Sequence, residues 1–266
     1  MPFAILPATV DDVPEMVPVG LLGFQNDLLN RAILPLHEAT PEQLEEHLTW
    51  RMARQRDRMT GEGRYFVKAV DEETGAIVGV CGIFSPEVVR QNAKEGTEAS
   101  GAEVVSVPDG EAKQKPKKLE MPSILKVELQ ERLEGVMKKA QGEILGGRED
   151  VWSKFSRLLF SSYASMADDN FPEIPTMVVH PDYQRRGIAK KLLLAACAHA
   201  DKVGQDVYLE ASPAGRNLYT SNGFEQCGVD DLGKIVGAEY FPLTYMLRRF
   251  RPEYAVAGAE ANGHAS

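Results

Sequence analysis

Apolar and polar residues follow two different periods along the first third of the chain. Residues 3–7 form a short apolar run that predicts a strand. Asp11-Asp12 then begins a stretch in which apolar residues recur every three or four positions, which predicts a helix. Residues 65–70 and 76–84 are largely apolar, and a polar turn separates them. These two runs predict an antiparallel β-hairpin.

A second helix is predicted between the first helix and the hairpin. Thr40-Pro41-Glu42 supplies an N-cap residue, a proline at the first helical position and an acidic residue in the first turn. The predicted helix extends to about residue 59, with an apolar side formed by Leu44, Leu48 and Met52. Its arginines are interpreted as a solvent-exposed face: Arg51, Arg54, Arg56 and Arg58.

The middle of the chain changes in composition. Residues 85–122 are rich in Glu, Lys, Gly, Ser and Pro, which predicts a flexible excursion. Helical periodicity returns at residues 124–144. A further helix is predicted from apolar residues at three- and four-residue steps, namely Trp152, Phe155, Leu159, Tyr163 and Met166. This helical insertion, residues 123–168, either packs on the core or forms one wall of a substrate pocket, and both can hold.

Strand and helix patterns alternate again in the last third of the chain. An apolar run at 174–179 predicts a strand, residues 182–187 a polar loop, and residues 188–203 an amphipathic helix. The segments that follow are predicted to be a strand, a short helix, a strand and a disordered polar tail: 206–212, 214–222, 241–250 and 255–266.

The loop at 182–187 has the features of an anion site. The N-terminus of the helix that follows has about four unpaired N–H groups and a partial positive charge. Gly187 lets a ligand approach the backbone closely, and Arg185 and Arg186 add positive charge. These features predict a phosphate cradle. The loop lacks the G-x-x-x-x-G-K-[ST] spacing of a nucleotide P-loop and the G-x-G-x-x-G of a dinucleotide fold.

Residues 179–189, V-H-P-D-Y-Q-R-R-G-I-A, resemble the acetyl-coenzyme A pyrophosphate loop of the GNAT superfamily of N-acetyltransferases, Q/R-x-x-G-x-G/A. Further matches in family order are Tyr208–Gly215, Leu218-Tyr219 and Asn222–Phe224. The amino-acid sequence of these segments is similar to that of uncharacterised fungal members of the superfamily. The resemblance implies one α/β domain over residues 1–254, with a mixed, mostly antiparallel sheet, helices on both faces and a helical insertion before the cofactor strand.

The resemblance also implies a reaction, the direct attack of a primary amine on the thioester of acetyl-coenzyme A. Tyr219 occupies the position of a general acid for the departing thiolate. Glu173 and Glu210 are candidate bases for the amine, and no motif decides between them. A strand N–H near Val179 is the expected donor to the thioester oxygen. The expected cofactor contacts are Met177, Val178, Val179, Gln184, Arg185, Arg186, Gly187, Ile188, Ala189 and Ser212.

Two positions depart from the family pattern. Many members have asparagine seven residues before the helix tyrosine, where this chain has Ser212, and alanine three residues later, where it has Gly215. A serine still hydrogen-bonds the pantetheine arm, directly or through water. The departure therefore weakens one contact and leaves the assignment in place.

Charge and composition narrow the classes of partner. A net charge of −9 and a pI near 5.2 argue against a nucleic-acid-binding surface. The histidines and the three cysteines show no metal-ligand spacing, and an odd cysteine count suits a reducing compartment. No signal peptide is evident, and no run approaches the ~20 apolar residues of a membrane span.

These observations predict a cytoplasmic monomer or homodimer that acts on a small-molecule or peptide amine. The alternative is a non-catalytic protein that binds acyl-coenzyme A on the same scaffold, as a sensor or interaction protein.

Overall fold

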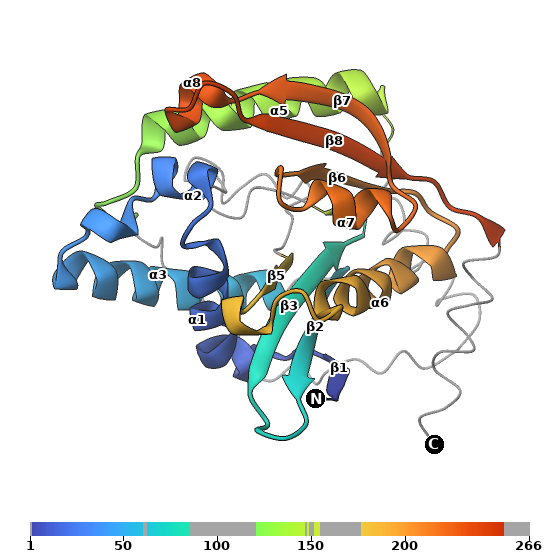
Figure 1. Cartoon of the computed structure of the whole chain (residues 1–266), viewed down its shortest axis with the longest axis horizontal. Helices are drawn as coiled ribbons and strands as arrows, with labels where there is room; N and C mark the ends of the chain where they lie inside the picture. The colour runs from blue at the N-terminus through green and yellow to red at the C-terminus, as the bar shows by residue number, and fades with distance from the viewer. Residues whose placement is uncertain are drawn as a thin grey trace, which may run out of the picture.

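The computed structural model describes residues 2–60, 63–85, 121–146, 148, 152–154 and 177–252. An eight-stranded sheet crosses the middle of the molecule (Figure 1). Its strands are β1 (Phe3–Pro7), β2 (Arg64–Asp71), β3 (Ile77–Phe84), β4 (Trp152–Lys154), β5 (Met177–Val179), β6 (Val207–Ala211), β7 (Glu225–Asp231) and β8 (Pro242–Arg248). The helices are α1 (Val13–Phe24), α2 (Leu28–Ile33), α3 (Pro41–Met59), α5 (Val127–Leu145), α6 (Ile188–Lys202), α7 (Arg216–Thr220) and α8 (Gly233–Val236). Short 3-10 turns lie at Val10–Asp12, Leu36–Glu38 and Pro181–Tyr183.

The strands lie side by side in the order β1-β2-β3-β4-β6-β8-β7, and β5 also pairs with β3. Every pair is antiparallel except β4 with β6, which is parallel. The predicted hairpin is the β2–β3 pair. The predicted fold class, a mixed and mostly antiparallel sheet with helices on both faces, is therefore confirmed.

β4 and β5 occupy one strand position beside β3. Ser153 of β4 pairs with Phe84 of β3, and Met177 of β5 pairs with Cys81 of β3. Phe84 and Cys81 are three residues apart, whereas Ser153 and Met177 are 24 residues apart in the sequence. β4 continues the sheet to β6, whereas β5 has β3 as its only strand neighbour among the described residues. The far edge of β5 therefore faces the C-terminal end of β6, and no strand of the described residues lies between them.

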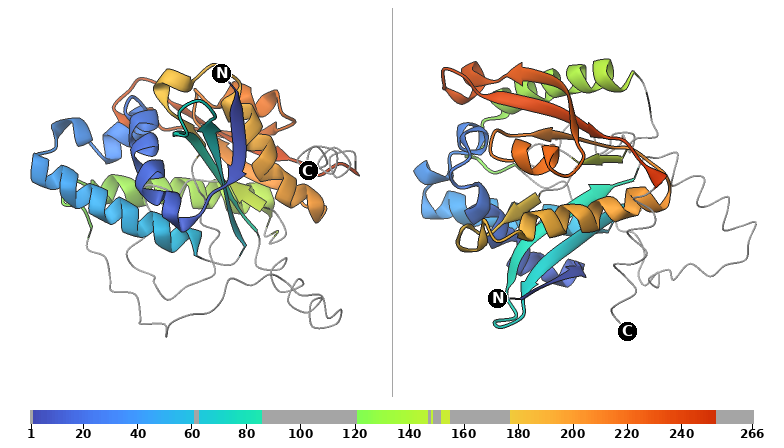
Figure 2. Two further views of the ribbon diagram at one scale, coloured as in Figure 1. Left: turned by 90° about the horizontal axis from the view of Figure 1, so that it is seen from below. Right: turned by 45° about the vertical axis from the view of Figure 1, so that its right-hand side comes forward.

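Helices cover both faces of this sheet (Figure 2). α6 packs on one face, where it shares a hydrophobic core with residues of β2, β3, β5 and β6. α1 and α3 cover the opposite face over β2, β3 and β5. α2, α5 and α8 cover that second face over β6, β8 and β7. The second face thus carries two separate groups of helices.

The helix predicted at residues 124–144 is α5, and it ends at Gly146 in the left-handed conformation (φ 58°). The helix predicted to begin near Trp152 is wrong at its start, because Trp152–Lys154 form strand β4. Pairing with β3 and β6 outweighs the local helical spacing there. The rest of that prediction, and most of the flexible excursion and the tail, lie outside the described residues.

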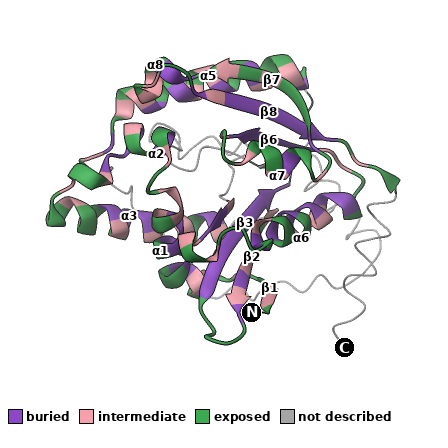
Figure 3. Ribbon diagram, in the orientation of Figure 1, coloured by how far each residue is buried: buried purple, intermediate pink, exposed green. Residues whose placement is uncertain are grey.

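α3 begins as predicted, with a capping box between Thr40 and Gln43. Its buried face is not the predicted one: Leu44 is 38% exposed, while Trp50, Arg51 and Arg58 are buried. Figure 3 shows buried, intermediate and exposed residues mixed along this helix, which packs on α1 and β2. The arginines were expected in solvent, so the interpretation is wrong for two of the four.

Candidate active site

The loop between β5 and α6 presents unpaired backbone N–H groups. Gly187 is the N-cap of α6 and has φ 80°, and Arg185 also has a positive φ of 63°. The first hydrogen bond of the helix runs from the Lys191 N–H to the Gly187 carbonyl, at 3.2 Å. The N–H groups of Ile188 and Ala189 precede that bond, so they point out of the helix end. The predicted helix-start geometry is therefore present.

Side chains within the loop hold its shape. Gln184 Nε2 donates to the Val179 carbonyl at 3.1 Å, and Arg186 Nη2 donates to the Asp182 carbonyl at 2.8 Å. The Arg186 guanidinium also lies over the Tyr183 ring, 5.1 Å from its centroid. Gln184 and Arg186 thus tie the loop to itself and to the end of β5. The guanidinium of Arg186 also keeps its positive charge beside the loop.

The backbone of β5 alternates between its two sides. The His180 N–H donates to the Val78 carbonyl at 2.8 Å, which makes these two residues a hydrogen-bonded pair of the antiparallel ladder. Since such pairs alternate, Val178 also bonds β3, while the N–H and C=O groups of Met177 and Val179 point the other way, into the β5–β6 gap. The Val179 carbonyl is held by Gln184. The backbone groups of Val178 therefore bond to β3, and Val178 offers no backbone donor to the gap.

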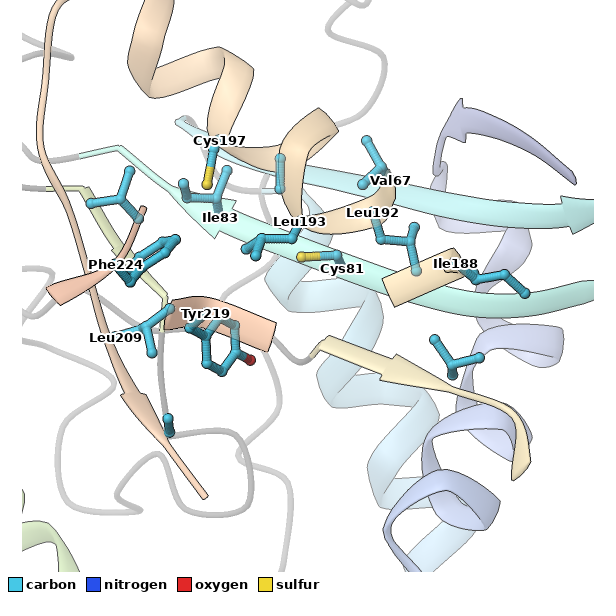
Figure 4. Close-up of a cluster of buried hydrophobic side chains, with 14 of the residues drawn as sticks. Val67, Cys81, Ile83, Ile188, Leu192, Leu193, Cys197, Leu209, Tyr219 and Phe224 are labelled. Carbon is cyan, nitrogen blue, oxygen red and sulfur yellow. The ribbon is translucent and has the colours of Figure 1, made fainter. Parts of the chain in front are cut away.

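Tyr219 lies in this gap. In Figure 4 its ring is between Leu209 of β6 and the β5 ribbon, and the hydroxyl oxygen is on the side of β5. The ring packs edge-on against Phe224, with centroids 5.7 Å apart. Burial, together with the nearby thiols of Cys81 and Cys197, raises the pKa of Tyr219, so its hydroxyl keeps its proton at neutral pH.

Gly215 makes room for the Tyr219 ring. A Cβ at position 215 would lie 2.9 Å from Tyr219 Cε2 and 3.7 Å from the hydroxyl oxygen. The backbone of Gly215 is in the ordinary right-handed region (φ −87°, ψ −23°). A larger residue at position 215 would therefore push against the Tyr219 ring, although the backbone there suits any residue.

Glu210 lies on the other face of β6, as alternation predicts. Val207, Leu209 and Ala211 join the core under α6, and Tyr208 joins the core under α2 and α5. Glu210 is 8% exposed, and among the described residues its Oε2 atom and the Tyr208 hydroxyl have no hydrogen-bond partner. Burial raises the pKa of the Glu210 carboxyl well above its ordinary value. A buried carboxyl with a raised pKa is a candidate proton acceptor.

The remaining predicted site residues have separate positions. Ser212 follows β6, and its carbonyl accepts hydrogen bonds from the N–H groups of Gly215 and Arg216, at 3.0 and 3.1 Å. Glu173 lies outside the described residues. Within the described ranges, no group of three His, Cys, Asp or Glu residues could hold a metal ion. Over the same ranges, no helix has the length and apolar character that crossing a membrane requires.

Residues 122–242 match the family model described as an acetyltransferase (GNAT) domain. The fold is the GNAT fold. Among solved structures, the chain resembles histone acetyltransferase HPA2 and related acetyltransferase from Corynebacterium glutamicum, with 18% identity and a TM-score of 0.51 over 94% of this chain and 98% of that one. It also resembles mosquito arylalkylamine N-acetyltransferase like 5b, with 15% identity and a TM-score of 0.50 over 93% and 99%. No curated protein matches.

The residues matched by the GNAT family model include both strands that border the β5–β6 gap, but they do not include α1 and α3. The match spans β5, the loop, α6 and Tyr219, whereas α1 and α3 precede residue 122. The sequence resemblance likewise identified Tyr219 and the loop. It missed the close approach of Gly215 to the Tyr219 ring, the buried hydroxyl of Tyr208 and the burial of Arg51, because each depends on side-chain packing that the sequence pattern does not show.

Proposed function

We propose that the protein is an acetyl-coenzyme A-dependent N-acetyltransferase that acts on a primary amine. The observation that carries the proposal is the edge of β5 at Met177 and Val179, which faces a gap beside β6, leads into a helix N-terminus and has Tyr219 within the gap. The match to an acetyltransferase (GNAT) domain supports the reaction class. The acetyltransferase names of two proteins of similar fold agree with it.

The cofactor would lie along this edge. The N–H groups of Gly187, Ile188 and Ala189 would hold the pyrophosphate, beside the charges of Arg185 and Arg186. The pantetheine arm would pair with the outward backbone groups of Met177 and Val179, and the Ser212 hydroxyl would meet it from β6. The acetyl group would then lie near the Val179 N–H, which supplies a donor to the thioester oxygen.

The chemistry would proceed by direct transfer. The amine nitrogen forms a bond to the acetyl carbon, the amine proton passes to the Glu210 carboxylate, and the carbon–sulfur bond breaks. Because the pKa of Tyr219 is raised above that of a thiol (about 8.5), its hydroxyl acts first as a hydrogen-bond donor to the departing thiolate. The proton that finally resides on sulfur passes through this hydroxyl, which takes a proton from solvent in turn, while Glu210 releases the amine proton to solvent, so both side chains return to their starting states. Glu173 remains the second candidate base.

Tyr219→Phe tests the proposal. Loss of a donor to charge that develops in the transition state costs about 10²–10³-fold in kcat. We therefore expect thiol release from acetyl-coenzyme A to slow by this factor in the variant, while calorimetry shows unchanged binding of acetyl-coenzyme A. Unchanged turnover would remove Tyr219 from this role.

The same measurements separate the alternatives. Binding of acetyl-coenzyme A without thiol release for any amine would support a non-catalytic acyl-coenzyme A-binding protein. No heat with coenzyme A would indicate another phosphorylated ligand. The resemblance to fungal members, the cytoplasmic location and the choice between monomer and homodimer stay predictions.

A further inference from the structure

One face of α3 carries buried positive charge. Arg51 is 8% exposed and Arg58 is 2% exposed. The Arg51 side chain crosses to α1, where Nη2 would be 3.9 Å from a Cβ placed on Gly20. Burial, and then the charge of Arg54, lowers the pKa of Arg51 to about 10, so the guanidinium is still charged at neutral pH. A buried charge of this kind occurs where an anion or a dipole meets it.

A small cavity lies beside this guanidinium. Its volume is about 20 Å³, and it is formed by Arg51 and Gln55 of α3 together with apolar side chains of α1, β2, β3 and β5. A space of this size holds about one water molecule, which a ligand group would displace. Arg51 and Gln55 supply its charged and amide donors, so its chemistry suits an anionic end group.

The cavity lies on the same face of the sheet as the proposed base. Val178 of β5 lines it, and the Val178 side chain packs with α1 on the face opposite α6. Tyr208 also points away from α6, and Glu210 shares its side of β6 by alternation. An amine that reaches the thioester from this face would therefore have Glu210 on the β6 side and Arg51 on the β5 side.

We propose that Arg51 and Gln55 form a subsite for a carboxylate of the acceptor, so that the acceptor substrate carries both an amine and a carboxylate, as an amino acid does. The inference rests on the proposed N-acetyltransferase function and assigns its substrate class. An arginine has five N–H donors, so it can hold a protein partner and a carboxylate together. A second cationic amine in the same place would be repelled, which disfavours polyamines.

The test compares linear acceptors of equal length that differ only at the far end. Aminohexanoate ends in a carboxylate, hexylamine in a methyl group and diaminohexane in an ammonium, and shorter members of each series are measured as well. The readout is kcat/KM from thiol release. We expect kcat/KM to be about 10-fold or more higher for the amino acid than for the alkylamine, because one charge-assisted hydrogen bond provides a preference of this size. The diamine should have the lowest kcat/KM of the three. The chain length of greatest preference measures the separation of the two subsites.

Two variants connect this preference to Arg51. Arg51→Gln should lower kcat/KM for the amino acid to the value for the alkylamine, with KM for acetyl-coenzyme A unchanged. Arg51→Lys keeps the charge without the planar fork and should retain part of the preference. Arg56→Gln removes the same charge from the exposed side of α3 and serves as the matched control, with the preference intact.

The outcomes are distinct. If the unmodified protein has equal kcat/KM for the three acceptors at every length, the proposed carboxylate subsite is refuted without any variant. An equal loss for all acceptors in Arg51→Gln and Arg51→Lys also overturns it. If no amine releases thiol, the proposed function fails, and calorimetric titration with aminohexanoate and hexylamine then decides the subsite, since tighter binding of the amino acid needs no turnover.

Discussion

Replacement of Gly215 by alanine adds one methyl group against the proposed donor. Position 215 has right-handed helical backbone angles that alanine adopts without strain. The new Cβ would lie 2.9 Å from Cε2 of the Tyr219 ring. The perturbation therefore acts on the ring, while residue 215 itself keeps its conformation.

The size of the effect follows from this distance. Carbon atoms pack best at about 3.5–4.0 Å, so the ring must retreat by roughly 0.6–1.1 Å. Tyr219 is buried against Phe224, which leaves it little space. Overpacking of this kind costs about 1–3 kcal/mol of folding stability. A displacement of about 1 Å at a reacting centre lowers the rate by up to ~10²-fold, so we expect kcat to fall by about 10- to 100-fold in Gly215→Ala.

The assay measures kcat, KM for acetyl-coenzyme A and urea-induced unfolding on the same preparations. Gly135→Ala is the matched control, because a Cβ at Gly135 on α5 meets no atom within 4 Å. That control should keep kcat and gain about 0.5–1 kcal/mol of stability, as glycine-to-alanine changes in helices do.

The double variant Gly215→Ala with Tyr219→Phe decides whether the ring transmits the effect. If it does, Gly215→Ala adds little further loss of kcat once the hydroxyl is absent, so the two effects are not additive. Full kcat in Gly215→Ala, or a fully additive loss in the double variant, would refute the reasoning.

Two further predictions concern a proton and a buried ion pair. A base must be deprotonated to act, and burial raises the pKa of Glu210, so kcat/KM should rise with pH through that raised pKa, above the ordinary glutamate range; Glu210→Gln should abolish this rise in a pH–rate profile. Asp201 receives two hydrogen bonds from Arg248, at 2.7 and 2.9 Å, in a buried pair that joins α6 to β8. Asp201→Ala should cost about 3–5 kcal/mol in urea unfolding, and joint replacement by Asp201→Leu and Arg248→Met should recover most of it, contrary to a simple sum of two losses.

Local chemistry made much of the site predictable. The helix start at Gly187 depends on neighbours within a few residues, and the left-handed Gly187 and the outward N–H groups of α6 agree with that prediction. The alternation of β6 likewise placed Tyr208 and Glu210 on one face. The period of side chains along a strand is a property of the strand itself, so no distant contact is needed to predict it.

Elements whose stability depends on distant partners were predicted poorly. β7 was not predicted, because its sequence E-Q-C-G-V-D-D lacks the apolar pattern of a strand; it forms an exposed edge by pairing with β8. Trp152–Lys154 have helical spacing with the residues after them but lie between β3 and β6. In both cases hydrogen bonds to another strand decided the structure.

The sequence by itself determined the strand–loop–helix unit around Gly187 and the β2–β3 hairpin, since these depend on short-range spacing and backbone preference, while the resemblance to the GNAT motif singled out Tyr219. The tertiary structure alone decided which strand edge has no partner among the described residues, which face of α3 is buried and how closely position 215 approaches the Tyr219 ring. Those features depend on residues far apart in the chain, such as Ser153 beside Phe84, and the free energy of burial is set by the neighbours that folding brings together.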